Sequence, residues 1–559
     1  MRKFISVLLI SFCSLAWATP THKSLSPTEQ AQKIIDRTKA KITATQNYWW
    51  NLPFRTGTVR RYCDCGTGAA VGCVQGNDST GDGSDANPYR TIGAAATWLN
   101  SSASSGATAA LCRGGSFLIS STQHLGTTSC SAGTMCRDLR DYSSTQFSST
   151  ARPILYVTTD IAGINDFSTG GGYRVFNLEL IGDYGGADVS GIRISNNTWP
   201  IGIYNNYIHD WHDGVQNNEY FGPTPNVYVE GNHLYHNYDW GFVGASDYGT
   251  LKYNYVDDNG GPDATLHNFY ISQQGHLSHN FKVIGNYLTG QYSGGTCLGT
   301  QLVGHSQGLG HEYRNNVIDI PDSEDSGGCY GMALSNVTAN GNPVDYTNTI
   351  VDGNLIINGG GRLFSISSCP NCVITNNLII KTSTLAGVTG MDIPYSTSRG
   401  VQDPINTANH VENNTIYFGP SSSGNNVGIY LHDEGTNHII TNNIIDYASS
   451  SGTIRCFNLP LAISAYDFID NNECSGSSLT WEYSRGYSLS AWTSYSGFDS
   501  HSTTTAPSFG GTSNNPSIGT DFVPTGTPPT ASGNGTYMPT YDFHGKTRPS
   551  PPAIGAIEP

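Results

Sequence analysis

Charge is scarce in this chain, and positive charge most of all. Asp, Glu, Lys and Arg make up 13% of the 559 residues, with 27 Lys and Arg against 43 Asp and Glu. The formal net charge of −16 disfavours nucleic acid and anionic membranes as partners, since no basic patch interrupts it. Beyond the N-terminal stretch no apolar run of about 20 residues is present, which excludes a membrane-spanning helix there.

The N-terminus has a basic start, an apolar run over residues 4–15 and an end of the Ala-x-Ala type at Ala18. This pattern predicts a signal peptide at residues 1–18, and hence a secreted or periplasmic protein. Cys13 offers an alternative, a lipid anchor, but the bulky Phe12 before it disfavours that processing.

Thirteen cysteines less Cys13 leave twelve, an even number in a chain expected in an oxidising compartment. We therefore expect disulfides, with local bridges in three clusters: Cys63, Cys65 and Cys73; Cys130 and Cys136; Cys369 and Cys372. The alternative is a zinc site built from Cys63, Cys65, Cys73 and Cys112. Export and the lack of paired CxxC elements disfavour zinc.

One short pattern recurs between Ile201 and Tyr447: an apolar residue, two others, an asparagine, any residue and another apolar residue. Its asparagines are Asn206, Asn232, Asn254, Asn286, Asn316, Asn354, Asn377, Asn414 and Asn443. Copies 22 to 38 residues apart indicate a solenoid, because each copy is too small to bury its own apolar face. Alternating β-branched residues predict strands, whereas helical repeats would need a 3.6-residue stripe and propeller blades a regular spacing of about 40.

The recurring asparagine has a physical use. Its amide can donate to and accept from the amides one coil above and below, so that a buried turn satisfies its polar atoms by stacking. The sequence therefore predicts an all-β fold, a right-handed parallel β-helix with an Asn ladder. The alternative, solvent-exposed turn asparagines, is disfavoured by the apolar pair that flanks each copy.

Two segments before the repeats predict helices. Ser26-Pro27-Thr28-Glu29 opens the first, with Ser26 as N-cap and Glu29 completing a capping box, and we expect this helix to dock on the outside or to act as a spacer. The second follows Asn87-Pro88-Tyr89-Arg90-Thr91-Ile92 and contains three consecutive alanines at 94–96.

The segment over residues 76–99 resembles the opening of secreted parallel β-helix proteins of the pectin-lyase-like superfamily, including family 9 pectate lyases. The resemblance implies that the short helix plugs the N-terminal end of the solenoid, which would otherwise expose unpaired strand amides. The segment around Trp492 and the end with Gly555, Ala556 and Glu558 resemble closing segments of the same superfamily, which fold back over the last coils.

These predictions divide the chain into five parts. They are a signal peptide at 1–18, an N-terminal helical extension at 19–60, a cap with the first strand at 61–110, the parallel β-helix at 111–470, and C-terminal coils with a closing segment at 471–559. Asp78, Asp82 and Asp85 are expected to form turns rather than to bind calcium, because the EF-hand spacing is not met.

Several charges are expected to be structural. Glu230, Lys252, Arg314 and Asp352 occupy the same outward position, two before the ladder asparagine. We expect ion pairs between coils, Glu230 with Lys252 and Arg314 with Asp352, each contributing little to stability.

A second strand follows each ladder copy, for example DGVQ at 213–216, WGFVG at 240–244 and HNFYIS at 267–272. Its outward residues would stack into a face on which an extended sugar chain can lie. Nine of the 16 histidines fall between 209 and 311. The same window contains acidic residues, and aromatic residues whose rings suit stacking on sugars. We expect catalytic groups at Asp213, Asp239, His267, Tyr270 and His305, and substrate-binding groups at Trp211, Tyr235, His236, Trp240 and Lys282.

Within this set Asp239, His267 and Tyr270 are the most compact group, because neighbouring coils lie about 4.8 Å apart. A His or Tyr suits a general acid or base, and a nearby carboxylate can tune it. The alternative for each residue taken singly is an ordinary hydrogen-bonding role beside a turn.

The sequence thus indicates an exported enzyme that cleaves a polysaccharide. The resemblance implies a lyase, which removes the C5 proton of a uronic acid while Ca²⁺, Arg or Lys neutralises the carboxylate, so Ca²⁺ is a candidate cofactor. The scarcity of Lys and Arg departs from that pattern and fits a glycoside hydrolase equally well. The alternative from another class is a non-catalytic, glycan-binding or adhesin-like β-helix. The oligomeric state stays open.

Overall fold

The structure is a computed structural model of the chain. It describes residues 27–559 except for 102–105, 126–129, 131–133, 167–171, 185–188, 196–199, 218–223, 264, 292–294, 335–345, 367–368, 394–407, 420–421, 423, 432–435, 449–452, 460–466, 510–523 and 526–531. The predicted signal peptide and the predicted N-cap Ser26 lie outside the described residues. Within the described part, no helix is long and apolar enough to cross a membrane.

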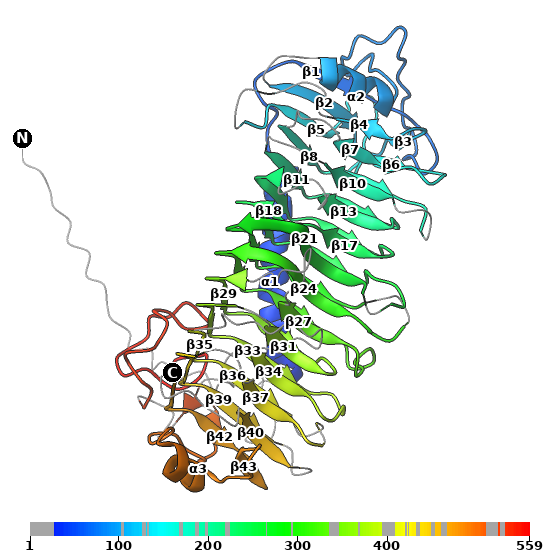
Figure 1. The fold of residues 1–559 in the computed structure, drawn as a ribbon. Coiled ribbons are helices and arrows are strands. Elements are labelled where there is room, and N and C mark those ends of the chain that lie inside the picture. The colour runs from blue at the N-terminus through cyan, green and yellow to red at the C-terminus, as the bar shows by residue number, and fades with distance from the viewer. Residues whose placement is uncertain are drawn as a thin grey trace, which may run out of the picture.

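Three parallel sheets, named A, B and C here, run the length of the molecule (Figure 1). Successive strands pass from A to B to C and back to A, which makes a right-handed parallel β-helix as predicted. Sheet A contains β1 (Val59–Tyr62), β2 (Ala107–Cys112), β5 (Arg137–Tyr142), β8 (Tyr173–Phe176), β11 (Ile201–Tyr204), β15 (Val227–Glu230), β19 (Thr250–Lys252), β22 (Lys282–Ile284), β25 (Glu312–Arg314), β29 (Ile350–Asp352), β32 (Val373–Thr375), β35 (His410–Glu412), β38 (Ile439–Thr441) and β41 (Phe468–Asp470).

Sheet B contains β3 (Ser116–Leu118), β6 (Ile154–Tyr156), β9 (Glu179–Ile181), β12 (Tyr207–His209), β16 (His233–Tyr235), β20 (Tyr255–Asp257), β23 (Tyr287–Thr289), β26 (Val317–Asp319), β30 (Leu355–Ile357), β33 (Leu378–Lys381), β36 (Thr415–Phe418), β39 (Ile444–Tyr447) and β42 (Glu473–Ser475). Sheet C contains β4 (Gln123–His124), β7 (Ile164–Asp166), β10 (Ser190–Ile194), β13 (Asp213–Asn217), β17 (Trp240–Val243), β21 (His267–His279), β24 (Thr300–Leu309), β27 (Tyr330–Leu334), β28 (Tyr346–Thr347), β31 (Arg362–Ile366), β34 (Thr389–Ile393), β37 (Val427–Leu431), β40 (Ile454–Asn458) and β43 (Leu479–Glu482).

Two small sheets and three helices complete the described elements. The small sheets pair β14 (Thr224–Pro225) with β18 (Ser246–Asp247), and β44 (Ser508–Phe509) with β45 (Pro524–Thr525). The helices are α1 (Pro27–Trp50), α2 (Ile92–Ser101) and α3 (Leu489–Ser496).

The predicted Asn ladder is confirmed, and it continues one rung further. Asn206 Nδ2 donates to Asn232 Oδ1 at 3.1 Å, and the same contact repeats at 2.9–3.1 Å through all nine predicted residues to Asn472. Each turn between sheets A and B also needs a left-handed residue just before the rung, such as Asn205 with φ 51° or Gly231 with φ 70°. Stacked amides thereby satisfy a buried turn without water.

A second, shorter ladder begins in the turn between sheets B and C, at Asn237 and Asn259, and continues into the first residues of β21 and β24. Asn237 Nδ2 donates to Asn259 Oδ1 at 2.7 Å, Asn259 Nδ2 to Asn268 Oδ1 at 2.8 Å, and Asn268 Nδ2 to Gln301 Oε1. Its members are 22, 9 and 33 residues apart, so the sequence shows no repeat. This ladder fixes the corner from which the candidate site residues project.

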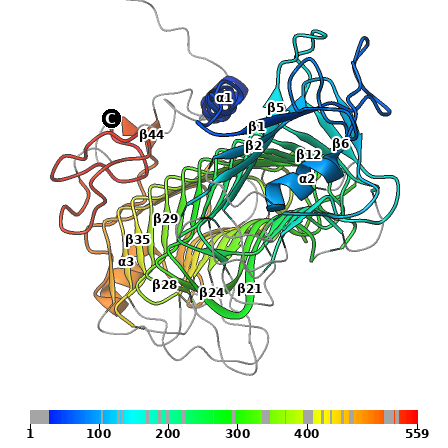
Figure 2. The same cartoon turned by 90° about the horizontal axis from the view of Figure 1, so that it is seen from above.

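Helix α1 is docked on the outside of the solenoid (Figure 2). Its buried Ile34, Ile35 and Ile42 pack in one cluster with outward residues of sheet B, among them Tyr287, Val317, Leu355, Leu378 and Ile380. Gln46 donates to the Gly231 carbonyl at 3.0 Å, whereas Ile34 and Gly353 line the same hollow. The helix therefore runs against the chain order of the coils. Twelve helical residues rise about 18 Å, which matches four coils of about 4.8 Å each.

Both ends of the solenoid are covered, as the resemblance implied. Helix α2 buries Ile92, Ala95 and Leu99 against the first coils. At the other end Trp492 of α3 is fully buried, and its indole N–H donates to Asp499 Oδ2 at 2.9 Å. The chain then folds back along the last coils, where the Gly555 N–H donates to the Asn442 carbonyl at 2.7 Å.

The twelve cysteines of the described residues form six disulfides. These are Cys63–Cys112, Cys65–Cys73, Cys130–Cys136, Cys297–Cys329, Cys369–Cys372 and Cys456–Cys474. The four sulfurs of the alternative zinc site are all used in disulfides.

The two ion pairs predicted between neighbouring coils are present. Lys252 Nζ lies 3.7 Å from Glu230 Oε1, and Arg314 Nη1 lies 2.5 Å from Asp352 Oδ2. The N-terminal aspartates accept hydrogen bonds from turn amides, such as Asp78 Oδ1 from the Arg90 N–H at 2.7 Å.

Candidate functional site

The outer face of sheet C brings several of the predicted residues together. Alternate residues of its strands point into the core, where Val215, Phe242 and Phe269 are fully buried. The strand register sets Asp213 beside Trp240, and Trp240 beside His267, in one column of neighbouring coils. The Asn ladder lies at the turn before sheet B, and the shorter ladder begins at the turn after it. Together they set the register of the coils and so fix the position of this column.

Four side chains form an aromatic cluster on this face, across three coils. The rings of Trp240 and Tyr270 stack with centroids 5.3 Å apart, and the His267 and Tyr270 centroids are 5.4 Å apart. The Tyr270 hydroxyl lies 3.4 Å from His305 Nδ1, and these two rings meet edge to face. Trp240, Tyr270 and His305 are each partly exposed, so the cluster presents both a flat apolar surface and polar atoms to solvent.

His267 is the buried member of this cluster, with 4% of its surface exposed. Burial, with a smaller effect from His305, lowers its pKa to about 3, and Nδ1 accepts a hydrogen bond from the Thr300 N–H at 3.1 Å. The imidazole is therefore neutral near pH 7, and because Nδ1 accepts, its proton is on Nε2. His267 thus offers a hydrogen-bond donor rather than a charge.

A second group lies at the start of the same strands. His212 Nδ1 is 3.6 Å from Asp213 Oδ1, and His212 Nε2 is 3.5 Å from Asp239 Oδ2. The Asp213 side chain has no exposed surface, whereas 14% of the Asp239 side chain is exposed. One ligand atom from each of the three lies within 4.8 Å of the others. These donors do not fit Ca²⁺, which takes six to eight oxygens, because one of the three is a nitrogen.

Sequence reasoning did not single out His209 and Asp210, which form a third group at the end of β12 and in the turn that follows it. The Asp210 carboxylate joins two histidines, with Oδ2 at 2.7 Å from His209 Nδ1 and Oδ1 at 2.6 Å from His236 Nδ1. Burial would lower the pKa of His209, but the hydrogen bonds with Asp210 and Glu179 outweigh it and raise the pKa to about 9. The signal in the sequence is their position, three and four residues after the ladder residue Asn206.

The predicted substrate-binding residues separate into different environments. Trp240 lies in the aromatic cluster, Tyr235 ends a strand of sheet B, and His236 is stacked on Tyr184 at 4.2 Å. Two expectations need correction. Trp211 has no exposed surface, and its indole N–H donates to the Leu180 carbonyl at 3.1 Å, so it packs in the core and offers no face to a sugar.

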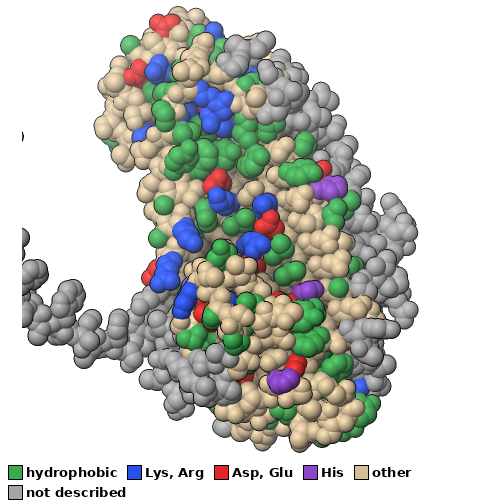
Figure 3. All heavy atoms as spheres, turned by 90° about the vertical axis from the view of Figure 1, so that its left-hand side faces the viewer, with side chains coloured by type: hydrophobic (Ala, Val, Ile, Leu, Met, Phe, Trp, Pro, Cys, Tyr) green, Lys and Arg blue, Asp and Glu red, His purple; other side chains and the backbone are tan. Residues whose placement is uncertain are grey.

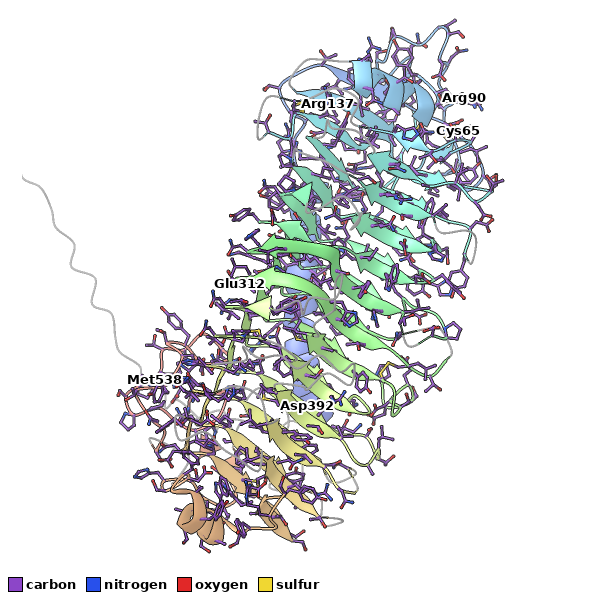
Figure 4. The ribbon with its side chains drawn as sticks, viewed as in Figure 1. Cys65, Arg90, Arg137, Glu312, Asp392 and Met538 are labelled. Atoms are coloured by element: carbon purple, nitrogen blue, oxygen red, sulfur yellow. A yellow bond between two sulfur atoms is a disulfide. The ribbon has the colours of Figure 1, made fainter. Side chains whose placement is uncertain are left out.

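Lys282 is the other correction, because it belongs to sheet A rather than to the face of sheet C. Its Nζ lies 2.8 Å from Glu312 Oε1. Figure 4 shows Glu312 at the left-hand edge of the molecule, while Asp392 marks sheet C. Lys282 therefore does not join the aromatic cluster.

Fold and site define a right-handed parallel β-helix protein with an aromatic and polar cluster on the outer face of one sheet. No protein-family model matches the chain, and no curated protein matches it. Several solved structures are similar to this chain at low sequence identity.

The A-module of the mannuronan C-5 epimerase AlgE4 of Azotobacter vinelandii has a TM-score of 0.43 and 14% identity over 71% of this chain and 91% of that one. The pectate lyase Pel9A has a TM-score of 0.35 and 12% identity over 90% of this chain and 97% of that one. The tailspike of E. coli bacteriophage HK620 in complex with a pentasaccharide has a TM-score of 0.43 and 12% identity, and covers 80% of this chain and 74% of that one.

Proposed function

We propose that this protein is an exported enzyme that cleaves a polysaccharide lying along the outer face of sheet C. The observation that carries the proposal is the Tyr270 hydroxyl, 3.4 Å from His305 Nδ1 and next to the stacked Trp240. A phenol and an imidazole in contact form a proton-transfer pair, and the indole gives a sugar ring a surface to stack on.

The pair suits β-elimination on a uronic acid. One partner removes the C5 proton, the C4–O4 bond breaks, and the departing O4 takes a proton from the other partner, which leaves a C4=C5 double bond. The neutral His267, with its proton on Nε2, is placed beside Tyr270 as a hydrogen-bond donor for the developing charge.

Glycoside hydrolysis is the second candidate, and one observation favours it. Carboxylate oxygens of Asp213 and Asp239 lie within 4.8 Å of each other, close to the roughly 5 Å of retaining glycosidases. Asp213 is fully buried, however, so only Asp239 of this pair reaches the surface. Elimination is therefore the preferred chemistry.

The experiment screens the purified protein on uronate-containing and neutral polysaccharides. A rise in absorbance near 235 nm identifies the unsaturated product of elimination, and new reducing ends without that rise identify hydrolysis. Turnover of no polysaccharide in the panel would contradict the proposal and support a non-catalytic, glycan-binding β-helix.

Tyr270→Phe is the matched variant, because it removes a single oxygen and keeps the stacked ring. We expect kcat to fall by about 10²–10⁴-fold, the usual contribution of a general acid or base, with the melting temperature unchanged. Tyr430→Phe, on the same sheet at Val427–Leu431, is the control and should keep full activity. Unaltered turnover of Tyr270→Phe would remove this pair from the mechanism.

A further inference from the structure

A hollow on the outer face of sheet A surrounds Lys282. It has a volume of about 330 Å³ and is lined by Tyr228, Glu230, Thr250, Lys252, Lys282 and Ile284. The register places Tyr228, Thr250 and Lys282 in one outward column of three successive coils. The side chain of Thr250 is short and lies between the longer side chains of Tyr228 and Lys282, which leaves a hollow above it.

The neighbouring column supplies the remaining lining. Glu230, Lys252 and Ile284 follow one another there in the same three coils. Beyond the end of β15, Gln46 of α1 donates to the Gly231 carbonyl. Towards the start of β15 lies the pair of β14 and β18, where Ser246 Oγ accepts the Val227 N–H. All six residues that line the hollow belong to strands of sheet A.

Its charge differs from that of the whole molecule. Two lysines and one glutamate line it, in a chain whose formal net charge is −16. Side chains of Lys252 and Lys282 keep 37% and 43% of their surface exposed although each has a carboxylate neighbour. Figure 3, which views the molecule from the left-hand side of Figure 1, shows lysine and arginine side chains gathered at mid-length between acidic ones.

We propose that this hollow is a second glycan-binding site, separate from the face of sheet C, for a carboxylated sugar unit of an acidic polysaccharide. The ammonium group of Lys252 or of Lys282 can bind a sugar carboxylate through charge-assisted hydrogen bonds, and the Tyr228 ring is an apolar wall for a sugar ring. The volume falls within the range of ordinary ligand sites. The surrounding negative charge opposes a nucleic acid, whose phosphates are far denser than sugar carboxylates.

The test uses isothermal titration calorimetry at low salt with hexamers of galacturonate, mannuronate and glucuronate. The protein carries Trp240→Ala, so that binding at the face of sheet C is weakened. We expect one remaining site for at least one hexamer. Lys252→Gln combined with Lys282→Gln should weaken that binding at least tenfold, whereas Lys41→Gln, on the exposed side of α1, should not change it.

Three outcomes would overturn the proposal: no binding of any hexamer in the Trp240→Ala protein, equal binding after the double lysine substitution, or equal binding of a neutral hexamer such as cellohexaose. Folding is not at issue for the double variant, because Arg314 Nε, 2.9 Å from Glu312 Oε2, still pairs with the carboxylate that Lys282 loses. The site does not depend on catalysis, so it stands or falls independently of the enzyme proposal.

Discussion

At the scale of single residues, hydrogen bonds shift the pKa values of His209 and Asp210 in opposite directions. The pKa of Asp210 is lowered, because its hydrogen bonds with His209 and His236 outweigh the burial that would raise it. The pKa of His209 is raised to about 9. Between these values both groups are charged, and the pair ties the turn between sheets B and C to the strand before it.

The pair predicts a window of pH in which His209 stabilises the fold. Its contribution is fully present below 6.5, the ordinary pKa of histidine, and is lost as the pH rises through about 9. The contribution of Asp210 is present above 3.8 and is lost as the pH falls through its lower folded pKa. The melting temperatures of wild type and His209→Gln should therefore differ most between about pH 4 and 6.5.

The control for this prediction is His124→Gln, at an exposed position of β4. Its melting temperature should follow that of wild type at every pH. A difference between wild type and His209→Gln that grows above pH 9 would contradict the assignment.

The interior of the Asn ladder gives a second prediction. Asn286→Ala removes the acceptor for the N–H and Nδ2 of Asn254 and the donor to Asn316 Oδ1 and the Leu251 carbonyl. Each orphaned buried group costs about 1–3 kcal/mol, so we expect the free energy of unfolding to fall by about 3 kcal/mol or more. Urea denaturation measures it, with the exposed Asn51→Ala as the control, which should stay within about 0.5 kcal/mol of wild type.

The site residues differ in how far the sequence could locate them. Sequence reasoning placed Asp213, Trp240 and His267 at the start of a recurring strand, where β13, β17 and β21 begin, and Tyr270 three residues further along β21. The prediction for Trp211 was wrong because this residue lies in a turn that the shorter ladder holds against the core. There Asn237 Oδ1 accepts the Trp211 N–H at 3.1 Å. That ladder has no regular spacing, so no pattern in the chain revealed it.

At the scale of elements, α1 depends on two kinds of contact. Its apolar side packs on sheet B, and Arg140 of sheet A donates to the carbonyls of Leu52 at 2.7 Å and Pro53 at 3.1 Å, just beyond the helix C-terminus. The sequence predicted the helix from its capping residues. It left docking on the outside and a spacer role as alternatives, because the partner residues are spread over coils from about 140 to 380.

Ile35→Asp should release this helix without unfolding the solenoid. Ile35 has 6% of its surface exposed, and a carboxylate there would be buried without a partner. We expect amide hydrogens of residues 34–50 to exchange at least tenfold faster, while those of sheet B strands keep their protection. Thr43→Asp puts the same charge on an exposed position of α1 and should leave exchange unchanged. Equal loss of protection throughout the molecule would show that α1 is not a separate unit.

At the scale of the whole molecule, the repeat predicted the architecture well, because the stacking of coils forces each asparagine to recur. The cysteines were less informative, since pairing depends on which coils meet. Cys63 has nearer neighbours in sequence, yet it bonds Cys112, 49 residues away, because β1 and β2 are neighbours in sheet A.

Loop length then predicts which disulfide matters most for stability. In the chain-entropy estimate, closing a loop of 49 residues contributes about 4 kcal/mol, and the three-residue separation of Cys369–Cys372 contributes about 2 kcal/mol or less. Replacing Cys63 and Cys112 by serine should therefore lower the free energy of unfolding more than replacing Cys369 and Cys372. Denaturant unfolding of the two double variants compares them directly, and the reverse order would contradict the estimate.

The early position of α1 in the chain determines when it can dock during synthesis. This helix is synthesised before the coils on which it packs, because its partner surface includes Leu378 and Ile380, which follow it by more than 300 residues. During synthesis it remains an unattached amphipathic segment, and it packs on the solenoid only when the middle coils are complete. Docking of α1 is thus a late step of folding. In a chain truncated before those coils, the helix would have no partner surface.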